Sequence, residues 1–69
     1  MKIKIQNGAT ETKLIFSDAE NLNKAIIAIK NCIKYPEACP IMEYEDKTDN
    51  MIFTAEYLKN SLIIIPKFL

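Results

Sequence analysis

The 69-residue sequence contains no arginine, no histidine and no tryptophan, and it has a single glycine. Without arginine the chain lacks the planar guanidinium group that is best suited to binding phosphate and guanine. Without histidine it lacks the commonest acid–base group and metal ligand at neutral pH. A single glycine also argues against a glycine-rich phosphate-binding loop. These absences make nucleic-acid binding and the common forms of enzyme catalysis unfavourable interpretations.

Charge and hydropathy argue against further classes of protein, those that bind nucleic acid or a membrane and those that are secreted. The nine basic residues, all of them lysine, balance nine acidic residues, so no overall field attracts nucleic acid, a membrane or an acidic partner. No apolar run approaches the roughly 20 residues that span a bilayer. The N-terminus alternates polar with apolar residues, unlike a signal peptide. We therefore expect a cytoplasmic protein with reduced cysteines, no membrane contact and one small domain over residues 1–69.

The dipeptide Asn7-Gly8 is the strongest local signal, because Asn-Gly fits the two positive-φ positions of a type I′ hairpin turn. Such a turn places Lys4 directly opposite Glu11, a favourable cross-strand pair. Hydrophobic alternation then assigns the two faces of the hairpin independently of the turn. The inward side chains are Ile3, Ile5, Thr10, Thr12, Leu14 and Phe16, and the outward ones are Lys2, Lys4, Gln6, Glu11 and Lys13.

A helix follows the hairpin. Ser17-x-x-Glu20 is a capping box, in which the serine hydroxyl and the glutamate carboxylate each accept from the other residue's amide. Pro36 disfavours helical backbone in the residue before it, so we expect the helix to end near Tyr35. Apolar residues recur at helical spacing and predict one buried stripe. The stripe consists of Leu22, Ala25, Ile26, Ile29 and Ile33.

Alternation predicts two further strands, over residues 41–45 and 51–57, with a polar turn over 46–50 between them. Residues 54–62 also fit a short second helix, and we keep this helix as the alternative. In the first of these strands Met42 and Tyr44 point inward. In the second, one face is shared by Met51, Phe53, Ala55 and Tyr57.

The last predicted strand, residues 61–65, is apolar on both faces. The faces of the other strands assign Leu62 and Ile64 to the side of the helix, and Ile63 and Ile65 to the outside. The predicted fold is α+β, in the order β-β-α-β-β-β. It is a mainly antiparallel sheet with one helix packed on one face.

Cys32 and Cys39 are the first candidates for chemistry. A Cys-x6-Cys pair without histidine or further cysteine cannot complete a four-ligand zinc site within one chain. We therefore predict no metal and interpret Cys32 as a small buried hydrophobe. The alternative is a redox role for the pair, or a metal site to which two chains contribute their thiolates.

An acidic group near residue 45 is the second candidate. Neighbouring carboxylates are the ligands of hard cations and the partners of acid–base catalysis. However, a loop without glycine is poorly suited to wrapping a cation, and a solvated sheet face explains the same residues. We predict no enzyme activity and no cofactor. The acidic group consists of Glu43, Glu45, Asp46 and Asp49.

The outer face of the predicted sheet is the surface that we expect to bind a partner, since contiguous exposed apolar residues mark interfaces. Lysines lie on the first hairpin and glutamates on the later strands, so two copies packed antiparallel would match opposite charges. A self-sufficient chain, whose final strand is covered by residues 66–69, is the alternative. The predicted interface consists of Ile15, Ile52, Ile63, Ile65, Lys2, Lys4, Glu43 and Glu45.

The leading hypothesis is a small non-enzymatic interaction or regulatory protein. It would self-associate, with a dimer as the favoured state, and it would bind another protein. A chain of this size and composition also suits an inhibitor of a host protein encoded by a phage or another mobile element. The alternative is a module that binds a small, nucleotide-type ligand in a pocket at an oligomer interface, using tyrosine and lysine side chains.

Overall fold

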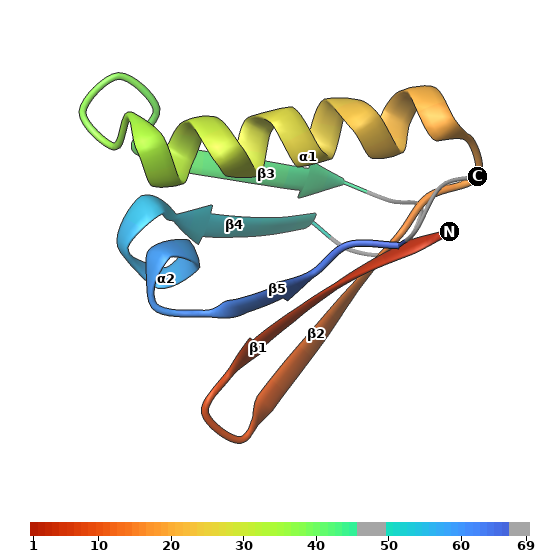
Figure 1. Ribbon diagram of the computed structural model, residues 1–69, viewed down its shortest axis with the longest axis horizontal. Coiled ribbons are helices and arrows are strands. Elements are labelled where there is room, and N and C mark those ends of the chain that lie inside the picture. The colour runs from red at the N-terminus through yellow and green to blue at the C-terminus, as the bar shows by residue number, and fades with distance from the viewer. Residues whose placement is uncertain (46–49, 67–69) are drawn as a thin grey trace.

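The computed structural model describes residues 1–45 and 50–66. The elements are β1 (Lys2–Asn7), β2 (Thr10–Ile15), α1 (Ala19–Lys34), β3 (Ile41–Glu45), β4 (Asn50–Thr54), α2 (Ala55–Lys59) and β5 (Leu62–Ile64). The predicted α+β class, the antiparallel pairing and the single long helix are confirmed. The strands form two sheets, of order β2-β1-β5 and β3-β4, where the sequence predicted one (Figure 1).

The β1–β2 hairpin has the predicted faces but a different turn. Asn7 pairs with Thr10, so the two loop residues are Gly8 and Ala9. Gly8 has a φ of 60°, and no other described residue has a positive φ, which indicates a type II′ turn and not type I′. Each residue therefore opposes a partner two positions further along than predicted. A shift of two keeps every side chain on its face, because the period of a strand is two.

Helix α1 begins one residue later than the capping box predicts. Asp18 is the N-cap, and its Oδ1 accepts a hydrogen bond from the Asn21 amide at 2.8 Å. Asp18 Oδ2 accepts a second bond from Asn21 Nδ2 at 3.0 Å. The prediction of Ser17 as the cap is therefore wrong, whereas the end of the helix at Tyr35 is confirmed.

The buried stripe of α1 is rotated slightly from the predicted one. Ile33 is 39% exposed, whereas Cys32 is 1% exposed and takes its place in the core. Ile26 is half-buried. The fully packed side chains of the helix are Leu22, Ala25, Ile29 and Cys32.

The second half of the chain contains the short helix that was the alternative. Strand β4 ends at Thr54, whose Oγ1 accepts a hydrogen bond from the Tyr57 amide at 3.1 Å and caps α2. Ala55 and Leu58 are buried on this helix. The prediction of a strand over 51–57 is therefore wrong beyond Thr54. Most of the predicted polar turn, residues 46–49, lies outside the described part of the chain.

The faces of β5 are the reverse of those predicted. Ile63 pairs with Ile5 and packs against the core. Leu62 and Ile64 point outward and are 61% and 46% exposed. The register follows from α2, because Ser61 Oγ donates to the Tyr57 carbonyl at 2.6 Å and accepts from the Asn7 side-chain Nδ2 at 3.0 Å.

One core joins the two sheets and the two helices. Residues that alternate along β1, β2, β3 and β4 meet the buried stripe of α1 and the inner side of α2. The predicted inward positions of β3, Met42 and Tyr44, are confirmed, with exposures of 4% and 6%. The members of the core are Ile3, Ile5, Leu14, Leu22, Ala25, Ile29, Cys32, Met42, Tyr44, Phe53, Ala55 and Leu58.

Candidate interaction surface

The outer side of the β2-β1-β5 sheet carries three exposed large apolar side chains. Ile15 is 66% exposed, Leu62 is 61% exposed and Ile64 is 46% exposed. Strand pairing places Ile15 opposite Lys2, and Ile64 opposite Lys4. We call this surface the basic face, defined by Lys2, Lys4, Gln6, Glu11, Lys13, Ile15, Leu62 and Ile64.

The charges of the basic face are mostly unpaired within the described residues. Lys4 Nζ lies 3.5 Å from Glu11 Oε1, a diagonal contact in the observed register. Lys2 and Lys13 have no ion pair with any described residue. The face therefore combines apolar area with a net positive charge.

The outer side of the β3–β4 sheet has the opposite charge. Ile52 is 64% exposed and pairs directly with Glu43, and Ile41 is 46% exposed. Glu43 and Glu45 are exposed and have no cationic partner among the described residues. We call this surface the acidic face, defined by Ile41, Glu43, Glu45 and Ile52.

The structure divides the predicted interface of eight residues between two surfaces and places two of its members on neither. Six of them lie on the expected outer sides, three on each sheet. Ile63 is a correction, since it packs against the core. Ile65, just after β5, is 39% exposed. The sequence did not identify Leu62 and Ile64, because the register of β5 depends on the short helix before it.

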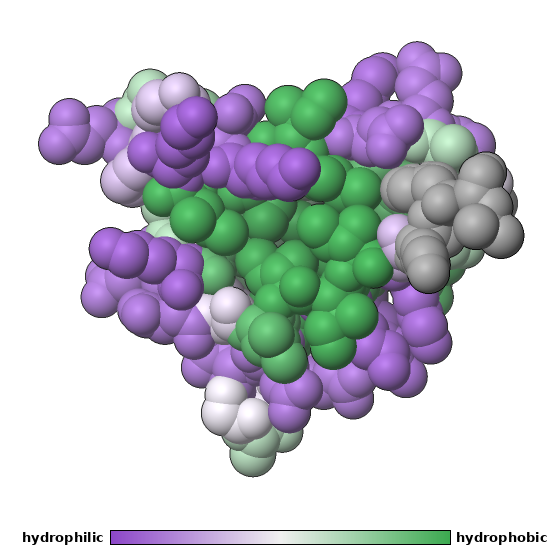
Figure 2. Space-filling model, in the orientation of Figure 1, coloured by the Kyte–Doolittle hydropathy of each residue, from purple (hydrophilic) through white to green (hydrophobic). Residues whose placement is uncertain are grey.

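Exposed apolar surface is not confined to the two sheet faces. Figure 2 shows apolar side chains gathered at the centre of one side of the molecule, in the region between α1 and β5 of Figure 1. Polar side chains surround this area. The chain therefore exposes more apolar surface than isolated single residues would give.

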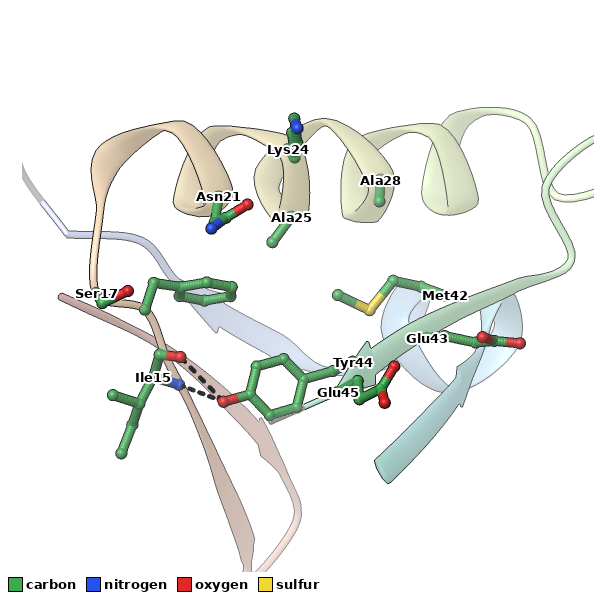
Figure 3. A pocket seen from close by; sticks show the side chains of 11 residues that line it. Ile15, Ser17, Asn21, Lys24, Ala25, Ala28, Met42, Glu43, Tyr44 and Glu45 are labelled. Carbon is green, nitrogen blue, oxygen red and sulfur yellow. Dashed lines mark hydrogen bonds between the residues drawn. The ribbon is translucent and has the colours of Figure 1, made fainter. Parts of the chain in front are cut away.

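A groove of about 760 Å³ lies between α1, the end of β2 and β3. Figure 3 shows Ala25 and Ala28 on α1 facing Met42 and Tyr44 on β3 across it. Polar groups also line the groove. Among them, Lys24 pairs with Glu20 at 3.5 Å. The groove therefore adds no support to the nucleotide-type alternative, which needs free cations.

Tyr44 closes one end of the groove. Its hydroxyl accepts a hydrogen bond from the Ile15 amide at 3.1 Å and donates one to the Ile15 carbonyl at 3.0 Å (Figure 3). Its ring packs edge-on against Phe16, with centroids 5.7 Å apart. One side chain thus makes, at the edge of β2, the two hydrogen bonds that a neighbouring strand would make, and it ties the two sheets together.

The cysteines and the acidic group complete the list of candidates. Cys32 is buried, and burial raises the pKa of its thiol, with a smaller contribution from neighbouring Cys39. Both thiols are free. No group of metal-ligating side chains forms among residues 1–45 and 50–66. Asp46 and Asp49, which the sequence grouped with Glu43 and Glu45, lie outside the described residues.

Comparison with known proteins finds no family model that matches the chain, and no significant match among curated proteins or solved structures. In the part of the chain that the structure describes, no helix is long and apolar enough to cross a membrane. A functional proposal therefore depends on the surfaces of the molecule itself.

Proposed function

We propose that this chain is a small, non-enzymatic interaction protein that acts by binding protein surfaces, including those of further copies of itself. The observation that carries the proposal is the basic face, where Ile15, Leu62 and Ile64 are exposed on the same surface as Lys2 and Lys13, which have no ion pair with a described residue. Fully burying one such side chain contributes about 1.5–3 kcal/mol. Covering all three would therefore contribute several kcal/mol to a complex.

The acidic face of a second copy is the partner that the charges favour. Each face exposes large apolar side chains, and the carboxylates of Glu43 and Glu45, which have no cationic partner among the described residues, are opposite in sign to Lys2 and Lys13. Complementary charges orient such a contact and raise its association rate. Because the two faces differ, the contact adds copies head to tail.

A regulatory or inhibitory role would use the same basic face. A partner protein that presents apolar and acidic side chains would compete with the second copy for this face. The absence of histidine from the sequence supports a binding role over a catalytic one.

The experiment compares substitutions of equal chemistry at different sites. Ile64→Glu on the basic face and Ile52→Glu on the acidic face should each weaken self-association about tenfold or more, since each removes apolar area from the contact. Ile27→Glu is the matched control, because Ile27 is 58% exposed on the outer side of α1. Sedimentation velocity across the micromolar range measures all three. Equal effects of Ile27→Glu and Ile64→Glu would overturn the face contact.

A further inference from the structure

The edge of β2 is the second feature that suits a copy of this chain. The Phe16 amide donates to the Met1 carbonyl at 2.8 Å, and the Met1 amino group donates to the Phe16 carbonyl at 3.2 Å. In an antiparallel ladder, hydrogen-bonded and non-hydrogen-bonded pairs alternate. The Ile3–Leu14 and Ile5–Thr12 pairs therefore also bond.

On β2, the residues that alternate with these hydrogen-bonded positions direct their backbone groups away from β1. These are Glu11, Lys13 and Ile15, whose N–H and C=O groups point to the open edge of β2. The groups of Ile15 are already bonded to the Tyr44 hydroxyl. Glu11 and Lys13 are exposed, and Figure 1 shows the β1–β2 hairpin projecting from the body of the molecule, with no described element paired beyond β2. The open edge is therefore Glu11 to Lys13.

We propose that two copies of the chain join by antiparallel pairing of their β2 edges about a twofold axis. Thr12 lies opposite Thr12 of the second copy, and Glu11 lies opposite Lys13 on each side of the axis. Each Glu11–Lys13 pair exchanges both of its N–H···O bonds across the new ladder. The result is one sheet of order β5-β1-β2-β2-β1-β5.

The charges of the edge select this register. Only residues whose N–H and C=O groups point outward can bond to the second copy, so the register can change only in steps that keep these residues opposite one another. The two neighbouring registers place Glu11 opposite Glu11, or Lys13 opposite Lys13, on the twofold axis. Like charges directly opposite each other destabilise a sheet, whereas opposite charges stabilise it. The twofold arrangement about Thr12 is the one that places both acids against both bases.

The edge of β3, one of the two edges of the β3–β4 sheet, does not suit such a dimer. The Ala55 amide donates to the Pro40 carbonyl at 2.8 Å, which sets the alternation along β3. The outward backbone groups there belong to Ile41, Glu43 and Glu45. A twofold pairing centred on this edge opposes Glu43 with Glu43 of the second copy. Repulsion between the two carboxylates disfavours it.

The edge contact goes beyond the proposed face contact and does not depend on it. Edge pairing leaves Leu62 and Ile64 exposed, since they lie on β5 at the far side of each sheet. In the joined sheet the two basic faces lie side by side on one surface. A dimer would therefore present twice the apolar and basic area to a protein partner.

Charge reversal at the edge tests the register. Glu11→Lys alone places lysine against lysine, and Lys13→Glu alone places glutamate against glutamate. Each variant should dimerise about tenfold or more weakly than the wild type, because two favourable pairs become unfavourable. An equimolar mixture of the two variants should form a heterodimer with opposite charges at every pair. The double variant Glu11→Lys/Lys13→Glu should dimerise like the wild type.

Matched controls carry the same changes in charge away from the edge. Glu56→Lys on α2 and Lys30→Glu on α1 are exposed positions, and they should leave dimerisation unchanged. Native mass spectrometry identifies the heterodimer, and sedimentation equilibrium measures its strength. Circular dichroism confirms that each variant is folded.

Hydrogen exchange gives an independent measurement on the wild-type chain. The amides of Glu11 and Lys13 should exchange freely in dilute solution and become protected as concentration rises. Free exchange at all concentrations overturns edge pairing. So does a mixture of the single variants that associates no better than either variant alone. If Ile64→Glu abolishes association while Glu11→Lys leaves it intact, the face contact holds and the edge contact is refuted.

Discussion

The Tyr44 hydroxyl links the two sheets, and Tyr44→Phe removes the hydroxyl while it keeps the ring. The hydroxyl makes two hydrogen bonds with the backbone of Ile15, at 3.1 and 3.0 Å. Phenylalanine keeps the ring in the core and its edge-on contact with Phe16. The substitution therefore separates the contribution of the hydrogen bonds from that of the packing.

The expected loss of stability follows from the two bonds. A hydrogen bond contributes about 1 kcal/mol net, and water that enters the groove can replace part of each bond. Tyr44→Phe should therefore lower the free energy of unfolding by about 1–2 kcal/mol. For a chain of this length that corresponds to a decrease in Tm of about 4–16 °C. Urea unfolding should show a lower midpoint with an unchanged m-value.

Tyr57→Phe is the matched control. The Tyr57 ring is half-buried beside Phe53, at 5.9 Å between centroids, and its hydroxyl makes no hydrogen bond to a described residue. The substitution should change stability by less than about 0.5 kcal/mol. If Tyr44→Phe costs no more than Tyr57→Phe, the hydroxyl does not hold the sheets together.

Three further predictions concern single residues. Asp18→Ala removes the N-cap of α1 and should lower the free energy of unfolding, measured by chemical denaturation, by about 1 kcal/mol. Ser17→Ala should change it little. A larger loss for Ser17→Ala than for Asp18→Ala would favour the capping box. Gly8→Ala should lower the free energy of unfolding by about 1 kcal/mol. The φ of Gly8 is 60° and open space surrounds the position, so only backbone strain opposes the new methyl group. An unchanged Tm would contradict the type II′ turn. Burial raises the pKa of Cys32, so the folded state holds its proton longer than the unfolded state, and stability should fall as pH rises above the ordinary pKa of a thiol. Iodoacetamide at neutral pH should therefore modify Cys39 before Cys32, and equal rates would contradict the burial of Cys32.

Local pattern was sufficient to predict the faces of the first hairpin and of β3. In both, a period of two runs through several residues, and turn position affects the pairing partner but not the face. The helix cap was less well determined, because Ser17 and Asp18 are both good N-cap residues and stand side by side. Their order depends on backbone geometry that the sequence does not show.

The error in β5 arose from a longer-range cause. Its residues are apolar on both sides, so alternation alone leaves its faces undetermined. The register depends on α2, which ends the preceding strand at Thr54 and places Ser61 against Asn7. The split into two sheets has the same origin, since α2 lies in the chain between β4 and β5. The basic and acidic character of the two surfaces was predictable, but their separation onto different sheets was not.

Sedimentation of the wild-type chain over a wide range of concentration is the decisive test of self-association. We expect a monomer in dilute solution and a reversible shift to dimers and larger species as concentration rises through the micromolar range. Moderate salt should weaken this association, because opposite charges orient both contacts. A single monomeric species at every concentration, with the chain folded, would contradict both the face contact and the edge contact.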